Sequence, residues 1–199
     1  MPRTEAGYEG RFDAAGWFLM SAVFRQRKNL VGKPPRLIDL GMGRGRDMIY
    51  FARRGFQVEG VDLSEARIER ARRRARRLGV RIRTEVADLR TYRFPRKYDV
   101  VFSTASLNFL PPKERVRRFA ALRTATARGG IHAVNAFLPE GKSRPAPDRD
   151  PAERPFRPGE LAGYYRGWIL LDTGRFEFAC DAGGPRHHHA LDYVVARRP

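Results

Sequence analysis

The stretch Leu37-Ile38-Asp39-Leu40-Gly41-Met42-Gly43-Arg44-Gly45 joins a short apolar segment to three alternating glycines. The apolar residues predict a buried strand over 36–40, and residues 46–54 predict a helix that Gly55 closes. Glycines at such a junction let the backbone turn tightly and come close to a ligand. The Gly-x-Gly-x-Gly spacing differs from the Gly-x-Gly-x-x-Gly of nicotinamide-binding proteins. The junction therefore predicts a ligand site in an α/β protein that is not of the nicotinamide type.

Strands and helices continue to alternate after this junction. Further strands are expected at residues 57–62, 80–86, 98–103 and 131–138, with helices at 64–78 and 112–126 between them. Such alternation is typical of a parallel sheet whose strands are connected by crossover helices.

The two ends of the chain depart from this alternation. An aromatic-bearing helix is expected over 14–29, and residues 1–33 are interpreted as a helical cap. The Pro-, Arg- and Asp-rich residues 139–158 predict an exposed loop long enough to serve as a lid. After the loop, the sequence predicts a short helix and the two strands of an antiparallel hairpin, at 159–167, 168–180 and 187–197. No linker divides the chain, which predicts a single domain over residues 1–199.

Polar residues stand at the carboxyl ends of the predicted parallel strands. Asp62 ends the second strand, where a carboxylate can accept hydrogen bonds from two ribose hydroxyls. Asp88 ends the third strand, where it can accept one from an adenine amino group, and Ser103-Thr104 end the fourth, beside the reactive end of a ligand. A single Asp after a strand is commonly a helix cap. Four such positions at one sheet edge, Asp39 included, instead predict a ligand site.

These residues also carry a resemblance to a known family. The series Asp39-Leu40-Gly41-x-Gly43-x-Gly45, Asp62, Asp88 and Tyr98-Asp99 resembles the class I S-adenosylmethionine-dependent methyltransferases over residues 36–138. The resemblance implies an α/β, Rossmann-like fold: a mostly parallel seven-stranded sheet with an antiparallel last strand and helices on both faces. It also implies S-adenosyl-L-methionine as the cofactor, S-adenosyl-L-homocysteine as the product and a small-molecule methyl acceptor. The residues expected to contact the cofactor are Asp39, Gly41, Met42, Gly43, Arg46, Asp62, Leu63, Ala87, Asp88, Leu89, Ser103 and Thr104.

A narrower resemblance, to the tellurite-resistance (TehB-like) methyltransferases, reaches most of the chain outside 1–33 and 139–155. The matching motifs are Gly45-Arg46-Asp47 with Tyr50, Ser103-Thr104 with Phe109-Leu110, and Phe156, Gly159-Glu160-Leu161, Tyr164-Tyr165 and Gly167-Trp168. The chain departs from that family at Met42, at Asp47 in place of Asn, and at Phe178-Ala179 in place of a His-Arg pair implicated in methyl transfer. The resemblance therefore implies methyl transfer, while tellurite, selenite and thiols all stay open as acceptors.

The start of the last strand is where the acceptor is expected. In this class the last strand runs antiparallel to the others, so Arg186-His187-His188-His189 would lie at the carboxyl edge of the sheet. Arg186 is predicted to anchor an anionic acceptor, and His188 to take a proton from an oxygen or nitrogen nucleophile. Alternation places these two side chains on one face and His187 and His189 on the other. The sequence does not decide which face meets the pocket, and a surface hairpin with solvent-exposed histidines is the alternative. Because alternation divides the three histidines between two faces, no metal site is predicted.

Composition limits the remaining classes of function. The 199 residues include one cysteine, Cys180, which excludes an internal disulfide and a multi-cysteine metal site. No apolar run of about 18 residues predicts a membrane span. No secretory signal is recognisable, so a cytoplasmic protein without a membrane partner is expected.

The net charge is the least ordinary property of the composition. Forty Lys and Arg against 22 Asp and Glu give a formal charge of +18, which indicates either a nucleic-acid surface or an arginine-rich genome. The arginines of the predicted helix 64–78 fall opposite an apolar face expected to be formed by Ile68, Ala71, Ala75 and Leu78, as on an ordinary solvent-exposed helix. An RNA or DNA methyltransferase and a non-catalytic S-adenosylmethionine-binding protein remain the alternatives to a small-molecule enzyme. The oligomeric state stays open.

Overall fold

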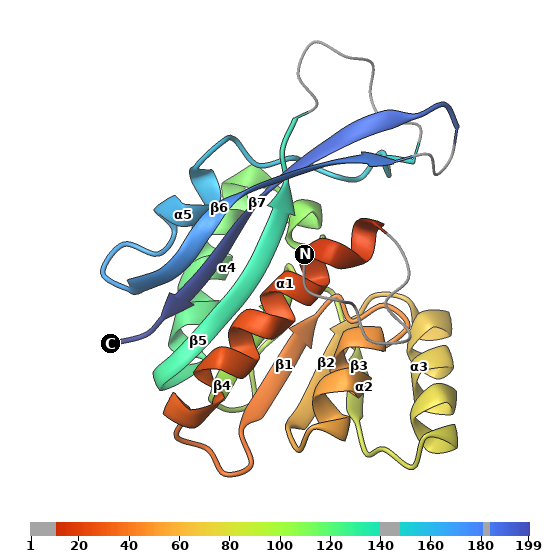
Figure 1. Cartoon of the computed structure of the whole chain (residues 1–199), viewed down its shortest axis with the longest axis vertical. Helices are drawn as coiled ribbons and strands as arrows, with labels where there is room; N and C mark the ends of the chain where they lie inside the picture. Colours follow the sequence, from red (N-terminus) through yellow and green to blue (C-terminus); the bar gives the residue numbers. More distant parts are fainter. Residues whose placement is uncertain (1–10, 140–147, 181–183) are drawn as a thin grey trace.

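A single twisted sheet runs through the molecule, as the computed structural model of residues 11–139, 148–180 and 184–199 shows (Figure 1). In these residues the sheet has seven strands in the order β3-β2-β1-β4-β5-β7-β6. Strands β1, β2, β3, β4 and β5 are parallel to one another, and β7 is antiparallel to both β5 and β6. The predicted fold class is therefore confirmed. The strands are β1 (Arg36–Leu40), β2 (Gln57–Asp62), β3 (Arg83–Val86), β4 (Tyr98–Ser103), β5 (Thr126–Phe137), β6 (Ile169–Cys180) and β7 (His187–Arg197).

Helices cover both faces of the sheet (Figure 1). Alternate residues of the central strands bury into two cores, so that Leu37 packs on the face of α1, α2 and α3 while Ile38 packs on the face of α4 and α5. None of the helices in the described part of the chain is long and apolar enough to cross a bilayer. The helices are α1 (Arg11–Gln26), η1 (Arg27–Asn29), α2 (Arg46–Arg53), α3 (Glu65–Arg77), η2 (Leu107–Phe109), α4 (Pro112–Thr124) and α5 (Glu160–Gly163).

The fifth strand differs most from its prediction. It begins at Thr126, before the two glycines that were expected to separate it from the preceding helix. A side chain on Gly130 would come within 3.0 Å of the Asp99 carbonyl, so glycine allows the strand to run close to β4. The register between these strands shifts between Tyr98 and Val100. Glycine here permits close strand pairing, and does not end an element.

The hairpin of β6 and β7 extends beyond the rest of the sheet. Pairing of β7 with β5 ends at Leu191 opposite Phe137, whereas pairing with β6 continues to His187 opposite Cys180. The outer end of the hairpin therefore projects past the carboxyl edge of the sheet, on the side of α1 (Figure 1).

Candidate cofactor and acceptor site

The glycine turn after β1 has the backbone that the sequence predicts. Gly41, Gly43 and Gly45 have φ of +72°, +53° and +73°, a region that side chains rarely tolerate. A Cβ on Gly41 would lie 2.0 Å from Ser106 Oγ, and one on Gly45 would lie 2.7 Å from Ala71 Cβ. A Cβ on Gly43 would meet nothing within 4 Å. The outer glycines are thus required by packing, and the middle one leaves its backbone accessible to a ligand.

Asp62, at the end of β2, holds this turn in place. Its carboxylate accepts a hydrogen bond of 2.8 Å from the N–H of Gly43 and one of 2.9 Å from the N–H of Ser64. The N–H groups of Gly41 and Met42 donate to the carbonyl of Val61, one residue earlier. Each carboxylate oxygen can accept one more hydrogen bond, so the predicted contact with ribose hydroxyls is compatible with these bonds.

Three carboxylates lie close together under the turn. Asp39, Asp47 and Asp62 are all buried. Burial raises the pKa of Asp39 well above its usual value, and the charges of Asp47 and Asp62 raise it further, while the backbone N–H of Met48 lowers it. Arg46 Nε lies 2.9 Å from Asp47 Oδ1 and offsets part of this charge. In a chain of net charge +18, this edge of the sheet is suited to a cationic ligand.

The predicted adenine-binding segment 87–89 also meets this site. Ala87 N–H donates to the carbonyl of Asp62, which brings the ends of β2 and β3 together. Asp88 accepts from the backbone N–H of Arg90 at 2.8 Å and from its guanidinium at 2.6 Å. The hydrogen bond from the Arg90 side chain holds the pKa of Asp88 below its ordinary value. Asp88 is therefore an anionic acceptor at the predicted place, and its contact with adenine stays a prediction.

Ser103 and Thr104 have different roles: Ser103 stabilises the sheet, and Thr104 lines a cavity. Ser103 is completely buried, and its hydroxyl donates to the carbonyl of Leu40, which ties β4 to β1. Thr104 lies near Asp47, with 3.4 Å between Oγ1 and Oδ2. Of the two side chains, only Thr104 borders a small cavity of about 70 Å3 beside the turn. The cavity is lined by Gly16, Arg46, Thr104, Ala105, Asn135, Phe178 and Leu191.

Five residues that line this cavity were not predicted as site residues, namely Gly16, Ala105, Asn135, Phe178 and Leu191, and two of them, Ala105 and Asn135, contact each other. Ala105 has a φ of +53°, which is strained for a residue with a side chain. Its N–H donates to Asn135 Oδ1 over 2.7 Å, and this bond holds the strained turn against β5. Asn135 is a polar residue within an apolar predicted strand, and that was the available signal. Nothing in the sequence marks Ala105.

The predicted acceptor residues Arg186 and His188 are exposed and do not line the cavity. The other face of β7, which carries His187 and His189, meets Phe178, the aromatic residue that lines the cavity. The His189 ring lies 5.4 Å from that of Phe178, a lining residue. The structure thus decides which face of the strand is turned inward, and the acceptor roles of Arg186 and His188 stay predictions.

A larger hollow of about 420 Å3 lies at the opposite, amino edge of the sheet. It is lined by residues such as Gly32, Arg36 and Asp99, where the Asp99 carboxylate accepts from the N–H groups of the other two. None of the predicted cofactor-binding residues borders it. Open α/β sheets bind ligands at the carboxyl edge, so the smaller cavity is the relevant one.

The segment that carries this turn also matches a known protein family. Residues 37–130 match the family model described as a methyltransferase domain. This match begins in β1 and includes the glycine turn, Asp62 and Asp88. Residues 37–130 thus match a methyltransferase domain, and the sheet around them has the order of the class I fold. S-adenosylmethionine is the cofactor of such domains.

Curated relatives and a solved structure resemble the chain over most of its length. It is 26% identical over 169 residues to Hemagglutinin 1 of Eikenella corrodens, covering 83% of this chain and 55% of that protein. It is 27% identical over 140 residues to the probable S-adenosyl-L-methionine-dependent methyltransferase TehB of Haemophilus influenzae, covering 70% of this chain and 48% of that protein. The chain therefore spans about half the length of these curated relatives. The crystal structure of TehB from Haemophilus influenzae superposes with a TM-score of 0.76 at 22% identity, covering 90% of this chain and 62% of that one, which shows the shared fold of the methyltransferase domain.

Proposed function

We propose that the chain is an S-adenosylmethionine-dependent methyltransferase that acts on a small-molecule acceptor with a soft nucleophilic atom. The observation that carries the proposal is the open backbone of Gly43 at a positive φ, whose N–H donates to the buried carboxylate of Asp62, itself close to buried Asp39. An accessible main chain suits close approach of a nucleoside, and the carboxylates suit hydroxyl donors and positive charge. The residues at this edge therefore fit the cofactor of the family.

Gly43 and three aspartates at this edge of the sheet each have a separate role in binding the cofactor in this proposal. When bound, the cofactor supplies a methyl group that its sulfonium already activates. Gly43 gives it room, Asp62 accepts from the ribose hydroxyls, and Asp88 accepts from the adenine amino group. Asp39 contributes the negative charge that a cationic ligand requires. The protein must then hold the nucleophilic atom of the acceptor close to the methyl group and in line with it. Such positioning alone can account for much of the rate.

The cavity beside Thr104 supports a small and soft acceptor. Its volume of about 70 Å3 is well below the roughly 300–1,000 Å3 of pockets for drug-sized ligands. Its polar lining comes from Arg46, Thr104 and Asn135, none of which is a usual general base. A thiolate, selenite or tellurite needs little help from a base, whereas a phenol or an amine would require one. The positive charge of Arg46 further favours an anion.

A screen with radiolabelled S-adenosylmethionine tests the proposal. Tellurite, selenite, small thiols, halides and phenols are offered separately, and transfer of label to the acceptor is measured. We expect transfer to at least one anionic soft acceptor and none to phenols. The Gly43→Val chain is the control, because a branched side chain would occupy the open space above the turn. Binding of cofactor without transfer to any acceptor would instead support the non-catalytic alternative.

A second candidate, methylation of RNA or DNA, rests on the charge of the molecule. The net charge is +18, and α3 exposes most of its arginines. Binding to phosphate backbones falls steeply with salt, so the log of the affinity should fall linearly with the log of the salt concentration. Label transfer to ribosomal RNA that exceeds transfer to every small acceptor would replace the first proposal with this one.

A further inference from the structure

We propose that Asp148, Cys180, His187 and His189 form a binding site for one transition-metal ion, with zinc(II) as the ion that suits the donors best. Each residue offers one ligand atom, and all four ligand atoms lie within 4.8 Å of one another. A thiolate, two imidazoles and a carboxylate form a donor set typical of zinc. The proposal does not depend on methyl transfer.

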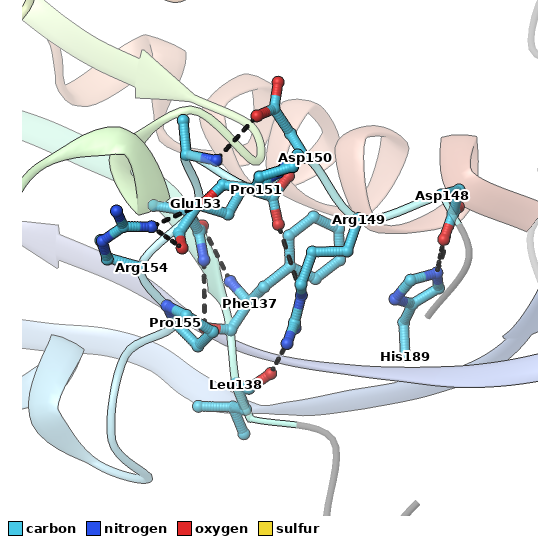
Figure 2. A network of polar contacts seen from close by, with 12 residues as sticks. Phe137, Leu138, Asp148, Arg149, Asp150, Pro151, Glu153, Arg154, Pro155 and His189 are labelled. Atoms are coloured by element: carbon cyan, nitrogen blue, oxygen red, sulfur yellow. Dashed lines mark hydrogen bonds and ion pairs between the residues drawn. The ribbon is translucent and has the colours of Figure 1, made fainter. Parts of the chain in front are cut away.

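The fold brings these four residues together from three segments. Cys180 ends β6 and pairs directly with His187, the first residue of β7. His189 lies two residues further along β7, and alternation places it on the same face as His187. Asp148 comes from the segment between β5 and α5, and its carboxylate points at the His189 ring (Figure 2). The middle residue, His188, is exposed.

The distances match a cluster that a small cation can occupy. His187 Nε2 lies 3.0 Å from His189 Nε2 and 2.8 Å from Asp148 Oδ1. Cys180 Sγ lies 3.5 Å from Asp148 Oδ2. With zinc bonds of about 2.0–2.3 Å in a tetrahedron, ligand atoms stand about 3.3–3.6 Å apart. The short pairs must open and the widest pairs, at up to 4.8 Å, must close, so side-chain shifts of up to about one ångström would admit the ion.

A second observation concerns the tautomer of His187. Its Nδ1 lies 2.9 Å from the carbonyl of Pro185, and a carbonyl only accepts, so Nδ1 carries the proton. In the neutral ring, the lone pair of Nε2 then points at the carboxylate of Asp148, and two acceptors face each other. A cation between them, or a second proton on His187, removes this conflict. Metal-binding histidines commonly donate their other N–H to a carbonyl in this way.

The number of protein donors favours a structural site, in which Asp148 is exposed, Cys180 and His187 are partly buried and His189 is buried. His189 is 5% exposed and lies between the rings of Phe137 and Phe178. Four protein ligands complete a tetrahedron and leave no position for substrate. The ion would join the hairpin to the segment that begins at Asp148. The neighbouring Arg149 already holds that segment to the carbonyl of Leu138 over 3.2 Å (Figure 2).

Metal loading of the full chain tests the site. The protein is incubated with zinc(II), freed of excess by gel filtration and analysed for bound metal by mass spectrometry. We expect one zinc per chain and a rise in Tm. Cobalt(II) in place of zinc should give the visible bands of a tetrahedral site and a near-ultraviolet thiolate-to-cobalt band. Cys180→Ser should remove that thiolate band.

Variants on the two faces of one strand separate a specific site from general binding by histidines. His187→Ala and His189→Ala each remove a direct ligand, so zinc binding should weaken by more than the about tenfold to hundredfold that loss of an outer-shell partner costs. His188→Ala, on the same strand, should bind zinc as the parent does. Substoichiometric zinc in the parent chain, a cobalt spectrum without a thiolate band, or equal loss in the His188→Ala chain would overturn the proposal. The first of these outcomes would assign the cluster to a protonated His187 paired with Asp148. If an alanine variant does not fold, the presence or absence of the thiolate-to-cobalt band in the parent chain still tests whether Cys180 binds the metal.

Discussion

The carboxylate of Asp62 accepts a hydrogen bond of 2.8 Å from the backbone N–H of Gly43, and so fixes the turn after β1 to the end of β2. The same carboxylate accepts from Ser64 N–H at the start of α3. One side chain therefore organises two neighbouring loops at the carboxyl edge of the sheet. Substitutions at either residue test whether this arrangement is built for a ligand or only for the fold.

Gly43→Ala should weaken cofactor binding more than it weakens the fold. The left-handed φ of this position makes any side chain strained by about 1–2 kcal/mol. Gly79→Ala is a matched control, because Gly79 also has a positive φ and an added Cβ there would also meet nothing within 4 Å, yet it lies at the end of α3. Both variants should lose similar stability in urea unfolding, and only Gly43→Ala should lose affinity for S-adenosylmethionine in calorimetry. Equal affinities in the two variants would contradict the site.

Asp62→Ala should reduce both affinity and stability. It leaves the N–H groups of Gly43 and Ser64 without this acceptor, and hydrogen bonds to a charged group contribute about 1.5–3 kcal/mol each. It also removes the proposed acceptor for the ribose. Calorimetry with S-adenosylmethionine and with methionine alone separates the two effects, since methionine lacks the ribose. A loss of affinity that is the same for both ligands would count against the ribose contact.

The carboxyl edge of the sheet and the residues that meet there could be predicted from the sequence, because their placement depends mainly on local patterns. Parallel strands that alternate with helices end at one edge, which places Asp39, Asp62 and Asp88 together without knowledge of any distance. The glycine spacing then identifies the turn. The strained Ala105 and its partner Asn135 depend on a contact across 30 residues, which no local pattern encodes.

The cluster of Asp148, Cys180, His187 and His189, for which a metal site is proposed, could not be assembled from the sequence for a related reason. Alternation separates His188 from its neighbours, but the approach of Cys180 and Asp148 depends on the hairpin register and on contacts between distant segments. Cys180 faces His187 only because the strands pair in that register. Asp148 reaches them from 32 residues before Cys180. Sequence reasoning that considered the three histidines alone could not include either residue.

Affinity for the cofactor should fall as the pH falls, through Asp39. Burial and two neighbouring carboxylates raise the pKa of Asp39 in the free protein, so it holds a proton to a higher pH than usual. A bound cation favours the ionised form, so binding releases a proton, and affinity decreases by up to about tenfold for each pH unit below the raised pKa. Calorimetry in two buffers of different ionisation enthalpy measures the released proton. Asp39→Asn should bind more weakly at neutral pH and release none.

Stability should also decline in mild acid, through His132. Burial, with a smaller effect of Arg123, lowers the pKa of His132 to about 3. Its Nδ1 lies 3.0 Å from Tyr165 OH and its Nε2 lies 2.7 Å from Thr126 Oγ1, so the neutral ring fills both positions. Between the unfolded pKa near 6.5 and about 3, only the unfolded chain binds the proton, and the free energy of unfolding decreases by up to about 1.4 kcal/mol per pH unit as pH falls.

His132→Gln is the comparison for that titration. Glutamine can still donate and accept but does not titrate, so its free energy of unfolding should change less between pH 7.5 and pH 5.5 than that of the parent chain. Urea unfolding at both pH values measures the difference. Identical pH dependence in the two chains would show that other groups control the acid sensitivity.

The acceptor end can be assigned by comparing Arg46 with Arg186. Arg46 lines the cavity beside Thr104, whereas Arg186 is exposed directly before β7, within the hairpin. A guanidinium fixed beside the nucleophile orients an anion through its planar fork, and an exposed one is screened by solvent. On an anionic acceptor, Arg46→Ala should lower kcat/KM by at least about tenfold, and Arg46→Lys should recover only part of it. Arg186→Ala should have a much smaller effect.

Cofactor affinity, measured in the same variants, identifies the step that is affected. Arg46 also contacts Asp47, so Arg46→Ala alone could disturb the carboxylate cluster. If cofactor affinity stays nearly constant while kcat/KM falls, Arg46 acts on the acceptor. If both fall together, Arg46 belongs to the cofactor site. A larger loss of turnover in Arg186→Ala than in Arg46→Ala would instead place the acceptor against the hairpin, and the cavity beside Thr104 would no longer be its site.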